Sequence, residues 1–160
     1  MYHTASRRRI MFHGKVIDAS KQSISLDEAK KFITSEQCGA SLFFIGTVRN
    51  HNNNKKVTGI TYDSHDAIVE KSFKEIYEEA IHKLTIDHPS VYIEHAKGYL
   101  GLGGISIIIA VAAKHRSQVY ELSRYIIEEI KKRTPIWKKE HYNDHQSDWL
   151  KGNPVHDLSK

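Results

Sequence analysis

The stretch KKRTPIWKKE, residues 131–140, decides how the rest of the chain is organised. A helical pattern leads into it, because apolar residues recur before it at helix-like spacing. Pro135 lacks a backbone N–H and would clash inside that helix, so the helix must end just before it. Residues 136–140 begin with β-favouring side chains and are predicted to be extended. Lys131 is therefore expected in the last turn of a helix and Lys138 just past the following turn, so both amines can point into one place.

This stretch has a chemical and a structural interpretation. A lysine in apolar or cationic surroundings has a lowered pKa and can serve as a nucleophile or proton carrier. Alternatively, the cations complement the dipole at the C-terminus of a helix and lie in a solvated turn. Taken alone, the stretch fits the structural interpretation better, since runs of charge usually belong to a solvated face. The rest of the chain decides between the two.

The composition limits the class of protein. With 160 residues, 39% of them apolar, the chain is long enough for one domain with a real core. It has no apolar run near the roughly 18 residues that a membrane-spanning helix needs. Cys38 is the single cysteine, so no internal disulfide can form and a reducing cytoplasm is expected, without a secretory signal in the basic residues 1–11. The formal charge of +5 indicates an anionic partner: nucleic acid, a phosphorylated small molecule or an acidic protein surface.

Periodicity predicts helices and strands that mix without strict alternation, which favours an α+β fold over a doubly wound parallel sheet. Ser25 and Glu28 fit a capping box that opens a helix ending near Gly39. The apolar run at 40–45 predicts a strand buried on both faces, and the polar residues 51–56 predict a mobile loop. The remaining predicted elements are a weak strand at 15–18, strands at 57–62, 91–95 and 105–113, a helix at 66–84 and a glycine-rich hairpin at 97–104.

Cationic side chains stand at several element ends. Ser117 is predicted to cap the last helix, and His115 and Arg116 would then lie at a helix N-terminus, where anions bind. The segment that holds Arg49 follows a strand, so this arginine is expected to face a cleft at the sheet edge. Each segment taken singly also fits a solvated turn. Together with the two lysines of the opening stretch, these residues have the composition of a cation-rich pocket for a small phosphorylated substrate.

Two other groups of residues carry less weight. His141 and His145 have the i, i+4 spacing of a zinc-binding helix, but Asn143 and Asp144 between them favour a loop. No cysteine or paired carboxylate completes such a site, so we expect no metal. Cys38 fits a small, half-buried apolar residue better than a reactive thiol.

Three motifs carry a resemblance to a known family. GTVRNHN at 46–52, KHRSQVYELSRYIIEEIKK at 114–132 and PIWKKE at 135–140, in this order, closely resemble the large, catalytic subunit of molybdopterin synthase. The resemblance covers about residues 12–152. It implies an α/β hammerhead fold with an added antiparallel β subdomain. The domain organisation expected from it is a family domain at 11–152, a disordered extension at 1–10 and a C-terminal tail at 153–160.

The resemblance also implies a function and partners. Members of the family form a homodimer within a heterotetramer, and each large subunit receives the Gly-Gly tail of a small ubiquitin-like subunit. That tail carries a thiocarboxylate, whose sulfur is transferred twice to cyclic pyranopterin monophosphate to create the dithiolene of molybdopterin. No cofactor, nucleic acid or membrane is implied, because the partner's thiocarboxylate supplies the sulfur. By this resemblance the chain is expected to be a cytoplasmic sulfurtransferase of molybdenum cofactor biosynthesis.

Residue roles follow from the same motifs. The two catalytic lysines of the family correspond to Lys131 and Lys138. The implied substrate-binding residues are these two lysines together with Thr47, Val48, Arg49, His115, Arg116, Lys139 and Glu140. Arginine and histidine would hold the phosphate, while the lysines would orient the thiocarboxylate and move protons.

Some positions depart from the family pattern, and other functions stay open. Ala96 stands where the family usually has arginine, and Gly104 where it commonly has glutamate, although no catalytic lysine is lost. One alternative is a basic RNA-binding module, weakened because aromatic residues do not alternate with the basic ones as in a stacking platform. The other is a scaffold that only binds the ubiquitin-like partner. Pull-down with the small subunit, followed by an assay of dithiolene formation, separates all three.

Overall fold

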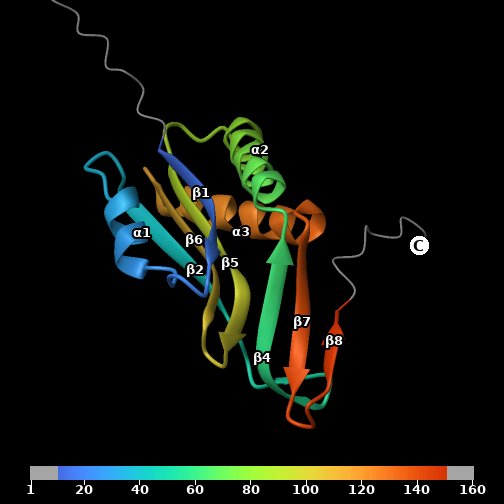
Figure 1. Cartoon of the computed structure of the whole chain (residues 1–160). Coiled ribbons are helices and arrows are strands. Elements are labelled where there is room, and N and C mark those ends of the chain that lie inside the picture. The colour runs from blue at the N-terminus through green and yellow to red at the C-terminus, as the bar shows by residue number, and fades with distance from the viewer. Residues whose placement is uncertain (1–10, 151–160) are drawn as a thin grey trace, which may run out of the picture.

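The computed structural model describes residues 11–150. Three helices and eight strands lie within this part of the chain (Figure 1). The helices are α1 (Leu26–Ile33), α2 (Asp66–Leu84) and α3 (Arg116–Arg133). The strands are β1 (Phe12–Asp18), β2 (Ala40–Thr47), β3 (His51–Asn52), β4 (Lys55–Ser64), β5 (Ser90–Gly101), β6 (Ile105–Ala113), β7 (Ile136–Tyr142) and β8 (Ser147–Trp149). The expected extension at 1–10, the tail at 153–160 and the last two residues of the expected 11–152 domain lie outside the described residues.

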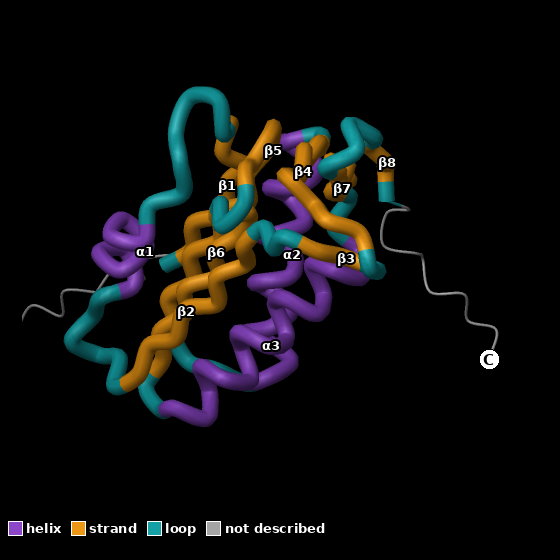
Figure 2. Tube along the Cα trace, turned by 90° about the horizontal axis from the view of Figure 1, so that it is seen from below, coloured by secondary structure: helices purple, strands orange, loops and turns teal. Residues whose placement is uncertain are grey.

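The strands form one sheet in the order β2-β6-β5-β4-β7-β8, with β1 paired to β5 and β3 paired to β4. β1 runs parallel to β5, and every other strand pairing within residues 11–150 is antiparallel. Figure 2 shows α1 on one side of the β2-β6-β5 part of the sheet and α2 and α3 on the other. The prediction of an α+β fold is confirmed. No helix between residues 11 and 150 has both the length and the apolar character needed to cross a membrane.

β6 lies at the centre of the core because its residues alternate toward two helical layers. Ile107, Ile109 and Val111 pack with α2 and α3, whereas Ile108 and Ala110 pack with α1. All five are at most 3% exposed, so both faces of this strand are buried. The predicted central strand is therefore confirmed, with the same bounds.

β5 is long enough to belong to two parts of the sheet. Its first half pairs with β1 and β6, and its second half pairs with β4. β4, β7 and β8 lie beyond it, away from α1 (Figure 1), and enclose a small separate core of Val48, Val57, Ile60 and Tyr142. This part of the sheet corresponds to the added antiparallel subdomain that the resemblance implies. It places β7 beside β4, and the two lysines of the opening stretch at the boundary with α3.

The stretch around Pro135 folds as predicted, with α3 ending before it and β7 starting after it. The C-cap residue Thr134 donates its backbone N–H to the Ile130 carbonyl at 3.1 Å. Thr134 is buried, and its hydroxyl lies 2.8 Å from the hydroxyl of Ser72 on α2. The end of α3 is thus held against α2, which sets the direction in which β7 leaves.

The capping box at the start of α1 is confirmed on its serine side, because Ser25 Oγ accepts from the Glu28 backbone N–H at 3.2 Å. The predicted helix end near Gly39 is wrong. Thr34 takes an extended conformation directly after the eighth helical residue, and its hydroxyl donates to the Lys30 carbonyl at 2.6 Å. A hydroxyl that satisfies a terminal carbonyl in this way ends the helix a turn and a half before the glycine.

The start of α3 also differs from the prediction. His115, and not Ser117, is the N-cap residue, so the helix begins at Arg116. The backbone N–H of His115 donates to the Gln118 side chain at 3.0 Å. This bond is the reciprocal half of a capping box, in which the side chain of the third residue after the cap accepts from the backbone N–H of the cap residue.

The segment at 51–56 is a tight hairpin and not the mobile loop that its polarity predicted. Asn53 and Asn54 have φ angles of +46° and +62°, and β3 and β4 pair on either side of them. Two consecutive residues with positive φ make the turn whose twist matches a two-residue hairpin, and asparagine tolerates that conformation. The polar composition was therefore a turn signal.

β2 is an edge strand, so the prediction that it is buried on both faces is wrong. Within the described residues it pairs with β6 alone, and Ile45 is 40% exposed. Leu42, Phe43 and Phe44 are only half-buried. An apolar strand of eight residues with an unpaired edge is unusual in a monomer and favours pairing with another chain.

Candidate active site

Lys131 and Lys138 reach the same place from two elements. Lys131 lies in the last turn of α3, after the buried Ile130, and Lys138 lies on the third position of β7. Surrounding protein atoms lower the pKa of Lys131 by desolvation, and the positive charge of Lys138 lowers it further. Both side chains remain accessible from solvent. The positive charges of the two lysines therefore act on one another, as the interpretation of this stretch as a pair of amines requires.

The segment after β2 is held against the small core. β2 shifts register between Gly46 and Thr47, and Val48 is buried with Val57, Ile60 and Tyr142. The Val48 backbone is fixed on both sides, because its N–H donates to the Gly104 carbonyl at 3.0 Å and its carbonyl accepts from Gly103 at 2.8 Å. Thr47 and Val48 therefore act as the rigid base from which the exposed Arg49 projects.

A chain of hydrogen bonds connects Arg49 to Glu140. Arg49 Nη2 donates to Asn52 Oδ1 at 3.3 Å, and Asn52 Nδ2 donates to Glu140 Oε1 at 2.9 Å. Glu140 is 3% exposed, and its other oxygen accepts from the Tyr142 hydroxyl at 3.0 Å. Lys138 and Glu140 are two residues apart on β7, so their side chains lie on the same face of the strand. The hydrogen bonds from Arg49 through Asn52 to Glu140 therefore link the first motif to the lysine motif.

Lys139 lies apart from this group. It stands between Lys138 and Glu140 on β7, so it points to the opposite face of the sheet. Its amine lies over the Trp149 ring, 5.6 Å from the centroid. The structure therefore does not bring Lys139 together with the other predicted site residues.

His115 and Arg116 are also separate from the lysines within one chain. They lie at the N-terminus of α3, whereas Lys131 lies near its C-terminus, fifteen residues after Arg116. A helix rises 1.5 Å per residue, so the two sites are about 22 Å apart along its axis. A single chain thus carries two separate cationic groups, and one chain by itself does not gather all the predicted cations into one pocket.

Two residues that sequence reasoning missed adjoin the lysines. Tyr62 on β4 is the direct partner of Lys138 in the antiparallel register. Its ring packs edge-on against His95 of β5, with 5.0 Å between centroids. Burial lowers the pKa of His95 to about 4, and the charge of Lys131 acts in the same direction. The available signal was the histidine that follows Val91 and Ile93 in the apolar alternation of β5.

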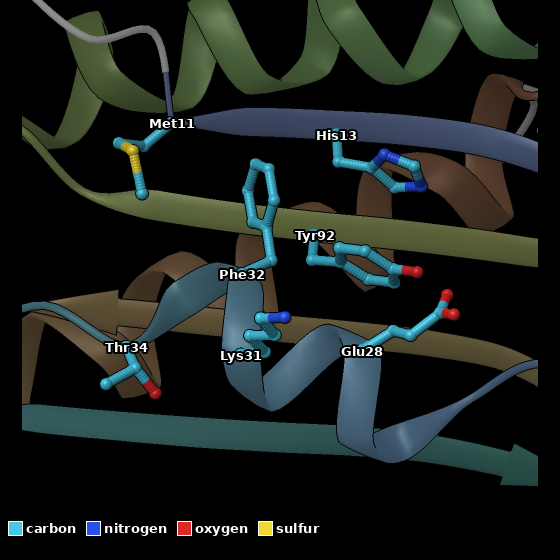
Figure 3. A pocket seen from close by; sticks show the side chains of 7 residues that line it. All are labelled: Met11, His13, Glu28, Lys31, Phe32, Thr34 and Tyr92. Atoms are coloured by element: carbon cyan, nitrogen blue, oxygen red, sulfur yellow. The ribbon is translucent and has the colours of Figure 1, made fainter.

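A cavity of about 420 Å³ lies on the other side of the sheet, between α1, β1 and β5. Figure 3 shows Phe32 of α1 and Tyr92 of β5 among its lining, with His13 beside Tyr92. The His13 and Tyr92 rings stack with 4.2 Å between centroids, and both bond to the buried Glu94 carboxylate, at 2.8 and 2.7 Å. None of the predicted site residues lines this cavity, so it is separate from the lysine group.

Among residues 11–150, no three histidine, cysteine or acidic side chains gather in a way that could hold a metal ion. The expected absence of a metal stays a prediction.

Known proteins resemble this chain both in sequence and in fold. The sequence profile of the MoaE protein family matches residues 19–133. The chain belongs to the MoaE family. A curated MoaE relative, the molybdopterin synthase catalytic subunit of Synechococcus elongatus, is 39% identical over 86% of this chain and 82% of its own length.

Solved structures of the MoaE family agree. The molybdopterin synthase structure from Staphylococcus aureus has a TM-score of 0.79 and 30% identity, covering 88% of this chain and 98% of that one. A chain of the complex of subunits 1 and 2 of molybdopterin-converting factor from Helicobacter pylori shares the fold, with a TM-score of 0.69 at 23% identity and coverage of 86% and 89%. The resemblance stated from the three motifs is thereby confirmed. The family is that of the catalytic subunit of molybdopterin synthase.

Proposed function

We propose that this MoaE-family chain is the catalytic subunit of a molybdopterin synthase. It takes sulfur from the thiocarboxylated Gly-Gly tail of a small ubiquitin-like subunit and transfers it, in two rounds, to cyclic pyranopterin monophosphate. The observation that carries this proposal is the pair Lys131 and Lys138, in which desolvation and mutual repulsion lower the pKa of Lys131. An amine whose pKa lies nearer to neutrality can hold a negatively charged tail and also release or take up a proton during the transfer.

The surrounding residues suit a phosphorylated substrate. Arg49 has a guanidinium that can bind a phosphate through two parallel hydrogen bonds, and Asn52 and Glu140 orient it. Lys138 lies on the Glu140 face of β7, so the phosphate and the reacting amines can belong to one bound molecule. In this arrangement the protein contributes positioning and proton transfer, and the partner contributes the sulfur, so no further cofactor is required.

A homodimer explains the separate position of His115 and Arg116. β2 has an apolar edge that no strand of residues 11–150 covers, and its first residue Ala40 pairs with Ala113, directly before the loop that holds His115. Two β2 edges related by a two-fold axis would run antiparallel, so the Ala40 end of one copy would meet the Thr47 end of the other. The partner copy's His115 and Arg116 would then approach the segment that carries Arg49. We propose that each active site uses these cations from the second copy.

The small subunit completes the assembly that we propose, a heterotetramer with a central homodimer. A protein of the same fold from Helicobacter pylori was solved as a complex of subunits 1 and 2 of molybdopterin-converting factor. The formal charge of +5 supports an acidic partner. Nucleic acid and membranes have no part in this proposal, and the cytoplasmic location expected from the single cysteine stays a prediction.

One experiment separates this function from the two alternatives. The purified chain is mixed with thiocarboxylated small subunit and cyclic pyranopterin monophosphate, and both co-purification and dithiolene formation are measured. Binding with turnover is expected. Binding without dithiolene formation would indicate a scaffold, and absence of binding together with retention of RNA would indicate a nucleic-acid module.

A further inference from the structure

His95 lies on the face of the sheet that α2 and α3 cover, beside the core cluster that includes Ile130 in the last turn of α3. Val91 and Ile93 precede it on alternate positions of β5, and both belong to the core formed with α2 and α3. Its partner on β6 is Ile107, which belongs to the same core. The imidazole is 5% exposed and packs against the Tyr62 ring. A histidine in an apolar core is usually a satisfied structural residue, so its hydrogen bonds decide whether it has another role.

The hydrogen bonds of His95 leave one ring nitrogen available. Nδ1 lies 2.8 Å from the carbonyl oxygen of Ala96. A carbonyl can only accept, so Nδ1 carries the proton and the lone pair of the neutral ring is on Nε2. No group among residues 11–150 donates a hydrogen bond to Nε2. In this part of the chain, every side-chain nitrogen or oxygen that solvent cannot reach has a hydrogen-bond partner. Nε2 therefore opens onto an accessible space.

Within residues 11–150, Lys131 lacks a hydrogen-bond acceptor, just as Nε2 of His95 lacks a donor. The next two residues of α3 have acidic partners, since Lys132 pairs with Glu129 and Arg133 pairs with Glu79. Lys131 pairs with no acceptor within the described residues, although an ammonium has three donors to satisfy. Ile130, directly before Lys131, lies in the same core cluster as Ile93 and Ile107, and Ile107 is the register partner of His95. Tyr62 contacts the His95 ring and is the register partner of Lys138, so α3, β5 and β7 bring the imidazole and the two amines into one region.

We propose that His95 is a positioning residue of the lysine site, whose Nε2 accepts a hydrogen bond from the Lys131 amine and holds it toward Lys138. This inference rests on the proposed function for its consequence in catalysis, but not for the contact itself. A neutral acceptor suits the position better than a carboxylate. A carboxylate would add a negative charge and stabilise the ammonium strongly, whereas an imidazole directs the amine and leaves its proton free to move. Tyr62 supports this role by fixing the ring from the side of β4.

The direct test measures the titration of Lys131 by NMR with isotope-labelled lysine. A hydrogen bond to the ammonium form favours that form, so losing the acceptor in His95→Phe should lower the pKa of Lys131 further. His95→Gln offers an amide oxygen near the position of Nε2 and should restore a titration close to wild type. His141→Phe is the matched control, because His141 bonds Thr61 on β4 through a contact separate from the lysine pair, and it should leave Lys131 unchanged.

Two results would overturn the proposal. One is an unchanged Lys131 titration in a folded His95→Phe protein, and the other is a His95→Gln protein that behaves like His95→Phe. If His95→Phe does not fold, the nitrogen chemical shifts of the wild-type imidazole still decide. The Lys131→Ala substitution should shift the Nε2 signal of His95 toward that of a free acceptor, and no change in that signal contradicts the contact.

The catalytic readout separates this inference from the proposed function. With cyclic pyranopterin monophosphate and thiocarboxylated small subunit, His95→Phe should lower kcat about tenfold with little change in KM, and His95→Gln should recover most of it. If wild-type protein forms no dithiolene, the proposed function fails while the titration result stands. If wild type is active and His95→Phe equals it in kcat, the positioning role is rejected.

Discussion

Asn52 donates a hydrogen bond from Nδ2 to Glu140 Oε1 at 2.9 Å, across 88 positions of the chain. One residue belongs to the hairpin that follows β2 and the other to β7, and the bond joins the two motifs that carry most of the predicted site. Glu140 is nearly fully buried, so its carboxylate depends on the donors that Asn52 and Tyr142 supply. Arg49 bonds to the same amide side chain, and the position of the cation that we propose binds the phosphate is thereby coupled to the lysine strand.

Asn52→Ala should therefore weaken both stability and substrate binding. It leaves one oxygen of the buried Glu140 without its donor, which should lower the free energy of unfolding by about 1–3 kcal/mol. It also releases Arg49, so binding of cyclic pyranopterin monophosphate should weaken. Chemical denaturation and calorimetric titration measure the two effects. Glu140→Gln can keep a bond to Asn52 after an amide rotation, and it should be the milder change; equal damage from both would show that the bond itself is unimportant.

Lys131→Ala should abolish most turnover and leave fold and partner affinity largely intact. A lysine at a helix C-terminus stabilises the helix by only about 0.3–1 kcal/mol. A placed proton donor or acceptor contributes roughly 100- to 10,000-fold in rate. Lys138→Ala should act in the same direction. Single-turnover dithiolene formation and thermal melts measure rate and stability side by side.

Lys131→Arg is the control for charge. A guanidinium keeps the positive charge but stays protonated, so it cannot act as nucleophile or base and should not rescue the rate. Near wild-type rates for Lys131→Arg would mean that the residue supplies charge alone, and the proton-transfer role would have to be abandoned.

Arg49→Ala and Arg116→Ala should weaken precursor binding more than partner binding. Each removes charge-assisted hydrogen bonds worth about 1.5–3 kcal/mol, and the effect should appear as a raised substrate requirement. Titration with the small subunit provides the comparison. A collapse of partner affinity instead would exclude the phosphate assignment.

The two-fold arrangement makes a separate prediction for mixed dimers. Lys131→Ala and Arg116→Ala chains, assayed at a substrate concentration too low for either to show much activity alone, should regain activity when refolded together, because half of the dimers would contain one intact site. The expected maximum is about a quarter of wild-type activity, from the symmetry of the dimer. A chain carrying both substitutions, mixed with either single variant, should regain none. No recovery in the first mixture would show that each copy builds its site alone.

Cys38→Ala should keep most activity. Cys38 lies in the α1–β2 connection, half-buried beside the α1 core cluster, and its backbone N–H bonds to the Ser35 carbonyl at 3.3 Å. This is the Ala40 end of β2, whereas Arg49 of the same chain follows the opposite end, and in the proposed reaction the sulfur comes from the partner's thiocarboxylate and not from a thiol of this chain. The assay is repeated sulfur transfer from fresh thiocarboxylated partner. Complete loss of activity in a folded Cys38→Ala protein would show that the sulfur passes through this thiol.

The buried His95 should make stability fall in mild acid. Its pKa is about 4 in the folded protein against an ordinary value near 6.5, so the unfolded state binds more protons between these two pH values. The contribution is fully present above pH 6.5 and decreases as the pH falls toward 4, by about 3 kcal/mol. His95→Gln should flatten this part of the stability curve, measured by denaturation at a series of pH values. An equally steep curve in the variant would assign the acid sensitivity to other groups.

Much of this protein could be worked out from its sequence. Helix α2 was predicted with its bounds, since its apolar stripe recurs over nineteen residues, and β6 was predicted from an uninterrupted apolar run. Pro135 placed the boundary between α3 and β7 because a proline excludes helix on purely local grounds. The three motifs led to the family, and local chemistry placed both lysines at element ends.

Tertiary structure decided what local signals could not. The sequence put Arg49, His115, Arg116 and the lysines at element ends, but only the folded chain shows that Arg49 is linked to the lysine strand through Asn52. The apolar run of β2 has the composition of a buried strand, and burial depends on which strand lies beside it; here one edge has no partner in the described residues. The contact between His95 and Tyr62 was not predicted, because it joins β4 to β5 and arises from the order of strands in the sheet, which sequence spacing does not reveal.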